Sequence, residues 1–168
     1  MKKLLVAAIL SSVSVGAFAY DAEVKFSGEV LNQTCEINGK NDGSDVQTVT
    51  LPKVNKSALA GADSWAGNTP FQFKLTNCPV QLTKAKWELR GEVDAAGTLK
   101  NTGAGTNATV RLIDPANNYI NIQTDAGYSF TPAADGSATL NYMAQYYSQA
   151  GSATPGPLET VGYWTLTY

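Results

Sequence analysis

Two cysteines, Cys35 and Cys78, are the residues of this chain best suited to covalent chemistry, and the sequence contains no histidine. In an exported protein, a lone pair of cysteines predicts one disulfide. Such a bond would close a loop of about 44 residues and would stabilise the fold by roughly 4 kcal/mol, mainly by restricting the unfolded chain. Two thiolates without an imidazole cannot complete an ordinary structural zinc site, so we expect neither a metal nor a cofactor.

No arrangement typical of an enzyme is present. The chain lacks a Gly-x-Ser-x-Gly nucleophile elbow and a P-loop, and its 14 acidic residues are dispersed. A glycosidase with paired carboxylates is the one enzymatic alternative left open, although the loops that would build its cleft are missing. Trp65 lies in a predicted loop flanked by Gly61, Ser64 and Gly67. It is a candidate contact for a ligand, or else it folds back onto the domain.

The first 19 residues have the pattern of a secretory signal peptide. Lys2 and Lys3 precede a short apolar run, and Ala17 and Ala19 satisfy the small-residue rule for cleavage. The apolar run is too short for a stable membrane span. Cleavage after Ala19 would leave 149 residues, which is one domain of ordinary size.

The charge of the remaining chain argues against nucleic acid as a partner. With 10 basic and 14 acidic residues left after cleavage, the net charge would be −4. A protein that binds nucleic acid normally presents a basic patch, and none is evident.

Alternating apolar and polar residues predict an all-β domain. Strands are expected within residues 71–75, 85–93, 108–112, 119–122, 128–130, 138–146 and 164–168. One helical turn is expected at 57–60, and the prolines of 153–157 rule out a central strand there. Turn-rich segments between the strands favour a β-sandwich of immunoglobulin-like type.

The two ends of the domain share an unusual feature. Residues 20–35 alternate like a strand directly after the leader, and the last predicted strand ends on Tyr168 with no charged side chain from Val161 onward. Long apolar edge strands promote aggregation unless something covers them. We therefore expect a strand at the start that needs a partner sheet and an uncovered edge at the end. The alternative is that the first strand pairs within its own sheet.

Four segments in this order resemble chaperone–usher pilins of the type 1 fimbrial major-subunit family. They are Val24-Lys-Phe-Ser-Gly-Glu-Val30 leading to Cys35, Phe71-Gln-Phe leading to Leu75-Thr-Asn-Cys78, Tyr142-Met-Ala-Gln-Tyr146 with Ala153-Thr-Pro-Gly156, and Trp164-Thr-Leu-Thr-Tyr168. Together they cover the whole domain after the leader.

The resemblance implies an all-β, incomplete immunoglobulin-like sandwich of six strands, with the seventh strand supplied in trans. It divides the chain into a signal peptide (1–19), an N-terminal donor-strand extension (20–28) and a pilin domain (29–168). The implied donor residues are Tyr20, Ala22, Val24, Phe26 and Gly28. The implied acceptor groove has Trp164, Leu166 and Tyr168 on one side, with Val30 and Phe73 on the other.

The same resemblance implies a structural subunit of an adhesive surface fimbria. Its partners would be neighbouring subunits in a head-to-tail polymer, a periplasmic chaperone, an outer-membrane usher and a host receptor. A minor adaptor or tip pilin, or a single-domain adhesin that binds a host glycan or protein, is the alternative. One departure from the family is Ala22, which stands where a glycine is usual.

Overall fold

The computed structural model describes residues 25, 27, 34–43, 45–90 and 92–168. The chain divides into two units, Met1–Val30 and Leu31–Tyr168, and every helix and strand described below lies in the second. Several sequence predictions lie outside the described residues: the signal peptide, Val30, and the donor residues Tyr20, Ala22, Val24, Phe26 and Gly28.

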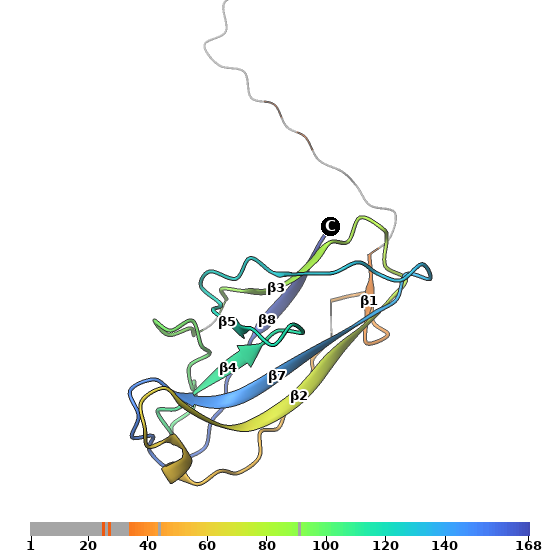
Figure 1. The fold of residues 1–168 in the computed structure, drawn as a ribbon. Coiled ribbons are helices and arrows are strands. Elements are labelled where there is room, and N and C mark those ends of the chain that lie inside the picture. The colour runs from red at the N-terminus through yellow and green to blue at the C-terminus, as the bar shows by residue number, and fades with distance from the viewer. Residues whose placement is uncertain (1–24, 26, 28–33, 44, 91) are drawn as a thin grey trace, which may run out of the picture. The chain divides into compact units, whose positions relative to one another are not determined.

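Two antiparallel sheets make up the fold (Figure 1), as the sequence predicted. The larger sheet has the strand order β1-β2-β7-β4-β5, and the smaller has the order β6-β3-β8. The strands are β1 (Glu36–Ile37), β2 (Ser64–Thr76), β3 (Lys84–Glu88), β4 (Thr109–Ile113), β5 (Tyr119–Ile120), β6 (Tyr128–Ser129), β7 (Ala138–Ser148) and β8 (Tyr163–Thr167). The only helix among the described residues is a 3-10 turn, η1 (Lys56–Leu59), close to the predicted turn at 57–60. It is neither long nor apolar enough to cross a membrane.

The long β2–β7 pair forms the frame of the larger sheet. Its inward positions are apolar on both strands, so Phe73 lies opposite Leu140 and Phe71 lies opposite Tyr142. Because side chains alternate between the two faces of a strand, one parity of each strand enters the core and the other faces outward. Leu75 (1% exposed) marks the best-buried point of this pair.

The strand β2 begins earlier than the sequence predicted. Its register with β7 shifts between Ala66 and Thr69, and Gly67 there has φ +72°. A side chain on Gly67 would also meet the Tyr146 ring at 3.0 Å. The glycine therefore introduces an irregularity that lets the strand continue. The prediction that Trp65 lies in a loop is wrong: Trp65 is in β2 and pairs with Tyr147.

The strand β3 ends sooner than the nine-residue alternation of 85–93 suggested. Pairing with β8 stops at Glu88, and the Arg90 N–H turns back to donate to the Glu88 carbonyl at 2.7 Å. Val93 then makes only an isolated bridge to Leu99. Alternation predicted which side chains are half-buried, but it could not detect the turn that interrupts the ladder.

Aromatic side chains from both sheets meet in the core. We call this set the central aromatic cluster; it comprises Phe71, Phe73, Trp87, Tyr142 and Trp164. Phe73 of the larger sheet stacks on Trp164 of the smaller sheet, with ring centroids 4.1 Å apart. Edge-to-face contacts of 5.9–6.2 Å join Trp87 to Tyr142 and Phe71. Such pairs contribute about 0.5–1.5 kcal/mol each beyond the burial of their area.

The outer edge of β2 is occupied along its C-terminal half. The strand β1 pairs with Leu75 and Thr76. The Asn38 N–H donates to the Lys74 carbonyl at 2.7 Å, and the Asn38 side chain accepts from the Lys74 N–H at 3.0 Å. The Gln47 amide donates to the Gln72 carbonyl at 3.2 Å. Pro70 lies two residues before Gln72 and has the same parity, so its missing N–H belongs to this edge.

Candidate functional site

The last strand, β8, has one open edge. It pairs with β3 over its whole length, from Glu88↔Tyr163 to Lys84↔Thr167, and with no other described strand. Within the described part of the chain, no main-chain hydrogen bond reaches β8 from its other side. A strand in this position presents a row of free N–H and C=O groups that can pair with another chain.

The side chains of β8 are apolar on the inward face. Trp164 and Leu166 are half-buried and pack against the hydrophobic core, while Tyr163 is 45% exposed. The structure thus brings three of the predicted groove residues together, because Trp164 stacks on Phe73 and Leu166 joins the same core.

A second segment without backbone pairing covers the same core. Among the described residues, the main chain of 46–54 makes no hydrogen bond, although Val49 and Leu51 pack against the core. Within this segment, the Gln47 side chain makes a polar contact to β2, to the Gln72 carbonyl. One edge of β8 and the main chain of 46–54 therefore lack backbone partners among the described residues, and both lie over one hydrophobic core.

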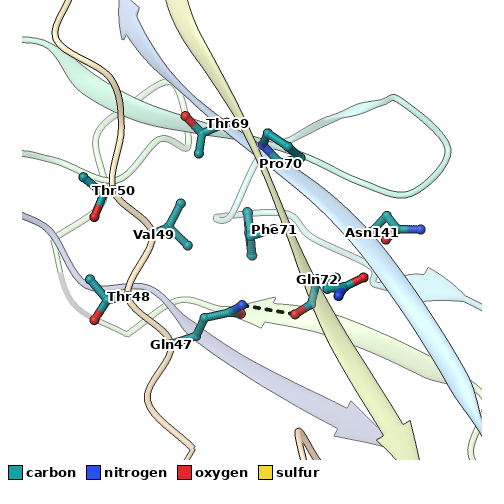
Figure 2. A pocket seen from close by; sticks show the side chains of 9 residues that line it. All are labelled: Gln47, Thr48, Val49, Thr50, Thr69, Pro70, Phe71, Gln72 and Asn141. Atoms are coloured by element: carbon teal, nitrogen blue, oxygen red, sulfur yellow. Dashed lines mark hydrogen bonds between the residues drawn. The ribbon is translucent and has the colours of Figure 1, made fainter.

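A cavity of about 530 Å³ lies between the 47–50 segment and β2 (Figure 2). Val49 projects from its segment toward the strand that carries Phe71, and the Gln47–Gln72 hydrogen bond spans the gap. The residues that line the cavity are Gln47, Thr48, Val49, Thr50, Thr69, Pro70, Phe71, Gln72 and Asn141. The 47–50 segment thus leaves room between itself and β2.

Beneath this region lies Tyr142 of the central aromatic cluster. Its ring is buried at 3% exposure, and its hydroxyl accepts a hydrogen bond from Trp164 Nε1 at 3.1 Å. Burial raises the pKa of the Tyr142 phenol to about 12, because the charged phenolate would lose its hydration; the bond from Trp164 opposes this increase. The bond ties β7 of the larger sheet to β8 of the smaller.

The two ends of the described domain meet beside β1. Cys35 and Cys78 form the predicted disulfide, with Cα atoms 4.3 Å apart. The Cys35 N–H donates to the Tyr168 hydroxyl at 3.2 Å, so the ring of the last residue reaches the start of the domain. Tyr168 stays 38% exposed.

Sequence reasoning missed Val49 and Leu51. These two residues share a parity, but the next positions of that parity on either side are the polar Gln47 and Lys53, and Pro52 follows Leu51 directly. The only signal that could have found them is the short alternation Val49-Thr50-Leu51 itself. Trp65 lies at the opposite end of β2 from the disulfide.

The arrangement offers main-chain pairing and apolar burial rather than covalent chemistry. In the described part of the chain, no three His, Cys, Asp or Glu side chains cluster in a way that could hold a metal ion.

Comparison with known proteins agrees with this geometry. The family model described as fimbrial protein matches residues 24–168. The chain is 34% identical over 172 residues to the major fimbrial subunit SMF-1 of Stenotrophomonas maltophilia (strain K279a), covering 95% of this chain and 99% of that protein. It is 32% identical over 174 residues to the F17 fimbrial protein of Escherichia coli, covering 95% and 94%.

Solved structures share the fold. The Burkholderia pseudomallei antigen and type I fimbria protein superimposes with a TM-score of 0.60 at 27% identity, covering 80% of this chain and 89% of that one. The P pilus rod subunit PapA superimposes with a TM-score of 0.59 at 21% identity, covering 80% and 98%, which speaks to the fold alone. The predicted immunoglobulin-like pilin fold is confirmed. The chain therefore belongs to the fimbrial protein family and is a structural pilin subunit, not an enzyme.

Proposed function

We propose that this subunit polymerises by strand exchange, in which residues 20–28 of one copy fill the open edge of β8 in the next. The observation that carries the proposal is that β8 has a described partner on one side only, while its half-buried Trp164 and Leu166 lie over the core. Strand addition to an open edge is a known mode of recognition, and chaperone–pilin pairs use it.

The donor segment supplies what such an edge lacks. Ala22, Val24 and Phe26 share one parity, while Glu23, Lys25 and Ser27 share the other. Fully burying Val24 and Phe26 would contribute roughly 1.5–3 kcal/mol each. A row of main-chain hydrogen bonds would add about 1 kcal/mol per bond.

The residues proposed to receive the donor form two walls. Trp164, Leu166 and Tyr168 belong to the β8 side, with Phe73 beneath them. The opposite wall contains the 46–54 segment, whose Val49 and Leu51 pack against the core. The family resemblance also implied Val30 on that side. A strand inserted between them would pair with the open edge of β8 on one side and with the main chain of 46–54 on the other.

The remaining steps follow from this assembly. Residues 1–19 direct export, residues 20–28 are donated, and residues 29–168 form the accepting domain. A periplasmic chaperone covers the open edge until an outer-membrane usher passes the subunit to the surface fimbria. Each subunit gives one strand and accepts one, so the contact is head-to-tail and extends into a filament.

Substitutions on the two parities of the donor segment test the proposal. Phe26→Asp buries an unpaired charge and should abolish the ladder of polymers that survives mild denaturant, whereas Ser27→Asp on the outward parity should leave it intact. Denaturing electrophoresis without heating, together with electron microscopy of the cells, provides the measurement. Deletion of residues 20–26 should leave a subunit that still accepts a donor peptide. Normal polymers from the Phe26→Asp or deleted chain would contradict strand exchange.

A further inference from the structure

The outward face of the larger sheet carries a group of aromatic rings around one arginine. We call Trp65, Arg111, Tyr119 and Tyr147 the outer aromatic patch. The Arg111 guanidinium carbon lies 3.9 Å from the ring centroid of Tyr119, 4.4 Å from that of Tyr147 and 5.4 Å from that of Trp65. The four residues come from β2, β4, β5 and β7, so regular strand pairing fixes their spacing.

Part of the Arg111 side chain is engaged by a buried glutamine. With the Gln145 amide oriented to satisfy its neighbours, its oxygen accepts from Arg111 Nε at 2.8 Å and Nη2 at 2.7 Å. The Gln145 nitrogen then donates to Asn68 Oδ1 at 2.7 Å, and Gln145 itself is 1% exposed. These contacts hold the guanidinium in place from its Nε–Nη2 side. They leave the Nη1–Nη2 edge, which is an edge that fits a carboxylate with two parallel hydrogen bonds.

The charge of Arg111 is not neutralised within the described part of the domain. Arg90 pairs with Glu88 and Lys100 pairs with Glu92, but no described carboxylate lies within 4.0 Å of the Arg111 nitrogens. Asp63, which borders the patch, accepts a hydrogen bond from the Tyr147 hydroxyl and is not paired with Arg111. A rigidly held cation without an acidic partner is complementary to an anionic ligand.

Two of the three rings beside this cation are accessible, while that of Tyr147 is buried. Trp65 is 51% exposed and Tyr119 is 58% exposed, which is unusual for large aromatic side chains outside a binding surface. Because these residues project from the larger sheet on the face opposite the central aromatic cluster, they take no part in the proposed strand exchange.

We propose that the outer aromatic patch binds a carboxylated sugar, such as a uronic or sialic acid. The sugar carboxylate pairs with the free edge of Arg111, and the apolar face of the pyranose ring packs on Trp65 or Tyr119. Asp63, which is bonded to Tyr147, and Asn68, which is bonded to Gln145, border the patch and offer polar partners for ring hydroxyls. A carboxylate on an Asp or Glu of another protein would reach Arg111 too, but its flexible methylene chain gives the two exposed rings no flat partner.

A matched pair of ligands measures the contribution of the carboxylate to binding. Methyl glucuronide and methyl glucoside differ at one carbon, and purified fimbriae provide the protein in its assembled form. Saturation-transfer NMR and titration calorimetry should detect the glucuronide, while the glucoside should bind about tenfold more weakly or worse. Binding should also weaken as salt rises from about 0.05 to about 0.5 M, because the Debye length shortens over this range. Equal binding of the two sugars would overturn the proposal.

Substitutions then locate the site. Arg111→Gln should lower glucuronide affinity about tenfold or more, and Trp65→Ala or Tyr119→Ala should lower it severalfold. Arg90→Gln, an exposed arginine elsewhere on the domain, should leave it unchanged. If Arg111→Gln does not assemble into fimbriae, Arg111→Lys keeps the charge, loses the two-pronged edge and should still weaken binding. Unaltered affinity in these variants, or equal affinity for a poly-glutamate peptide, would refute a sugar site.

Discussion

The outer edges of β2 and β8 border the same hydrophobic core, but they differ in what covers them. The β2 edge is occupied by β1, by Asn38 and by the Gln47 side chain, and it is interrupted by Pro70. The β8 edge has none of these devices among the described residues. Covered edges are what a stable monomer needs, and an uncovered one that carries Trp164 and Leu166 fits a subunit whose sheet is completed by another copy.

The largest expected contrast between the two edges is in how much free energy of unfolding is lost when a core leucine is truncated. Leu75→Ala on β2 should destabilise the domain by about 2–5 kcal/mol, whether or not a donor is bound, because Leu75 is already buried. Leu166→Ala on β8 should cost only about 1 kcal/mol in the free subunit, because part of its side chain still meets water. Urea unfolding measures both.

Adding a synthetic peptide of residues 20–28 sharpens that contrast. The peptide should stabilise the unaltered domain and raise the cost of Leu166→Ala toward that of Leu75→Ala, since a bound strand buries Leu166. If the peptide changed the cost of both substitutions equally, the difference between the two edges would not be real.

The hydrogen bond between Trp164 and Tyr142 joins the two sheets, and its effect on stability is expected to be smaller than that of the leucine substitutions. The unfolded chain releases the Tyr142 proton near pH 10, whereas burial in the folded protein raises the pKa of Tyr142 to about 12. The corresponding stabilisation is therefore complete below pH 10 and is lost as the pH rises from 10 toward 12. Ultraviolet absorbance titration of the phenolates should show a late-titrating tyrosine that disappears in Tyr142→Phe.

Trp164→Phe is the companion variant for that titration. It removes the hydrogen bond that opposes the increase in pKa, so the titration of Tyr142 should move to still higher pH. A shift to lower pH would show that Trp164 does not reach Tyr142 in solution.

The smallest expected effect is at the covered edge. Gln47→Ala removes the side-chain hydrogen bond to the Gln72 carbonyl, which is exposed, and should cost less than about 1 kcal/mol. Thr50→Ala, which lines the same cavity, is the control and should cost less still. Thermal unfolding compares the two. A larger loss from Gln47→Ala would mean that this bond holds the whole 46–54 segment.

Much of the fold could be predicted from alternation alone. The segments 108–112 and 138–146, predicted as strands, contain most of β4 and of β7. The disulfide followed from two cysteines in a chain with a leader, and it is present. These features are local or depend on composition, so a single sequence carries them.

Other features depend on contacts between distant residues. Trp65 looked like a loop residue because glycines flank it, yet the irregularity at Gly67 keeps β2 paired with β7. The 46–54 segment is not part of a β-ladder among the described residues, because its main chain makes no hydrogen bond there. A strand pattern in the sequence therefore could not reveal it. The outer aromatic patch arises from four strands whose order in the sheet no single segment encodes.

Pro70 has a consequence for the shape of the assembled fibre. Pro70 has no N–H, and the main-chain groups of Lys74 and the Gln72 carbonyl are already bonded to Asn38 and Gln47, so the β2 edge is poorly suited to pair with a second incoming strand. Of the β2 and β8 edges, only that of β8 is then left as the proposed acceptor. A subunit with two acceptors could bind two donor subunits, and the polymer would branch. A subunit with one acceptor adds to a linear, unbranched polymer.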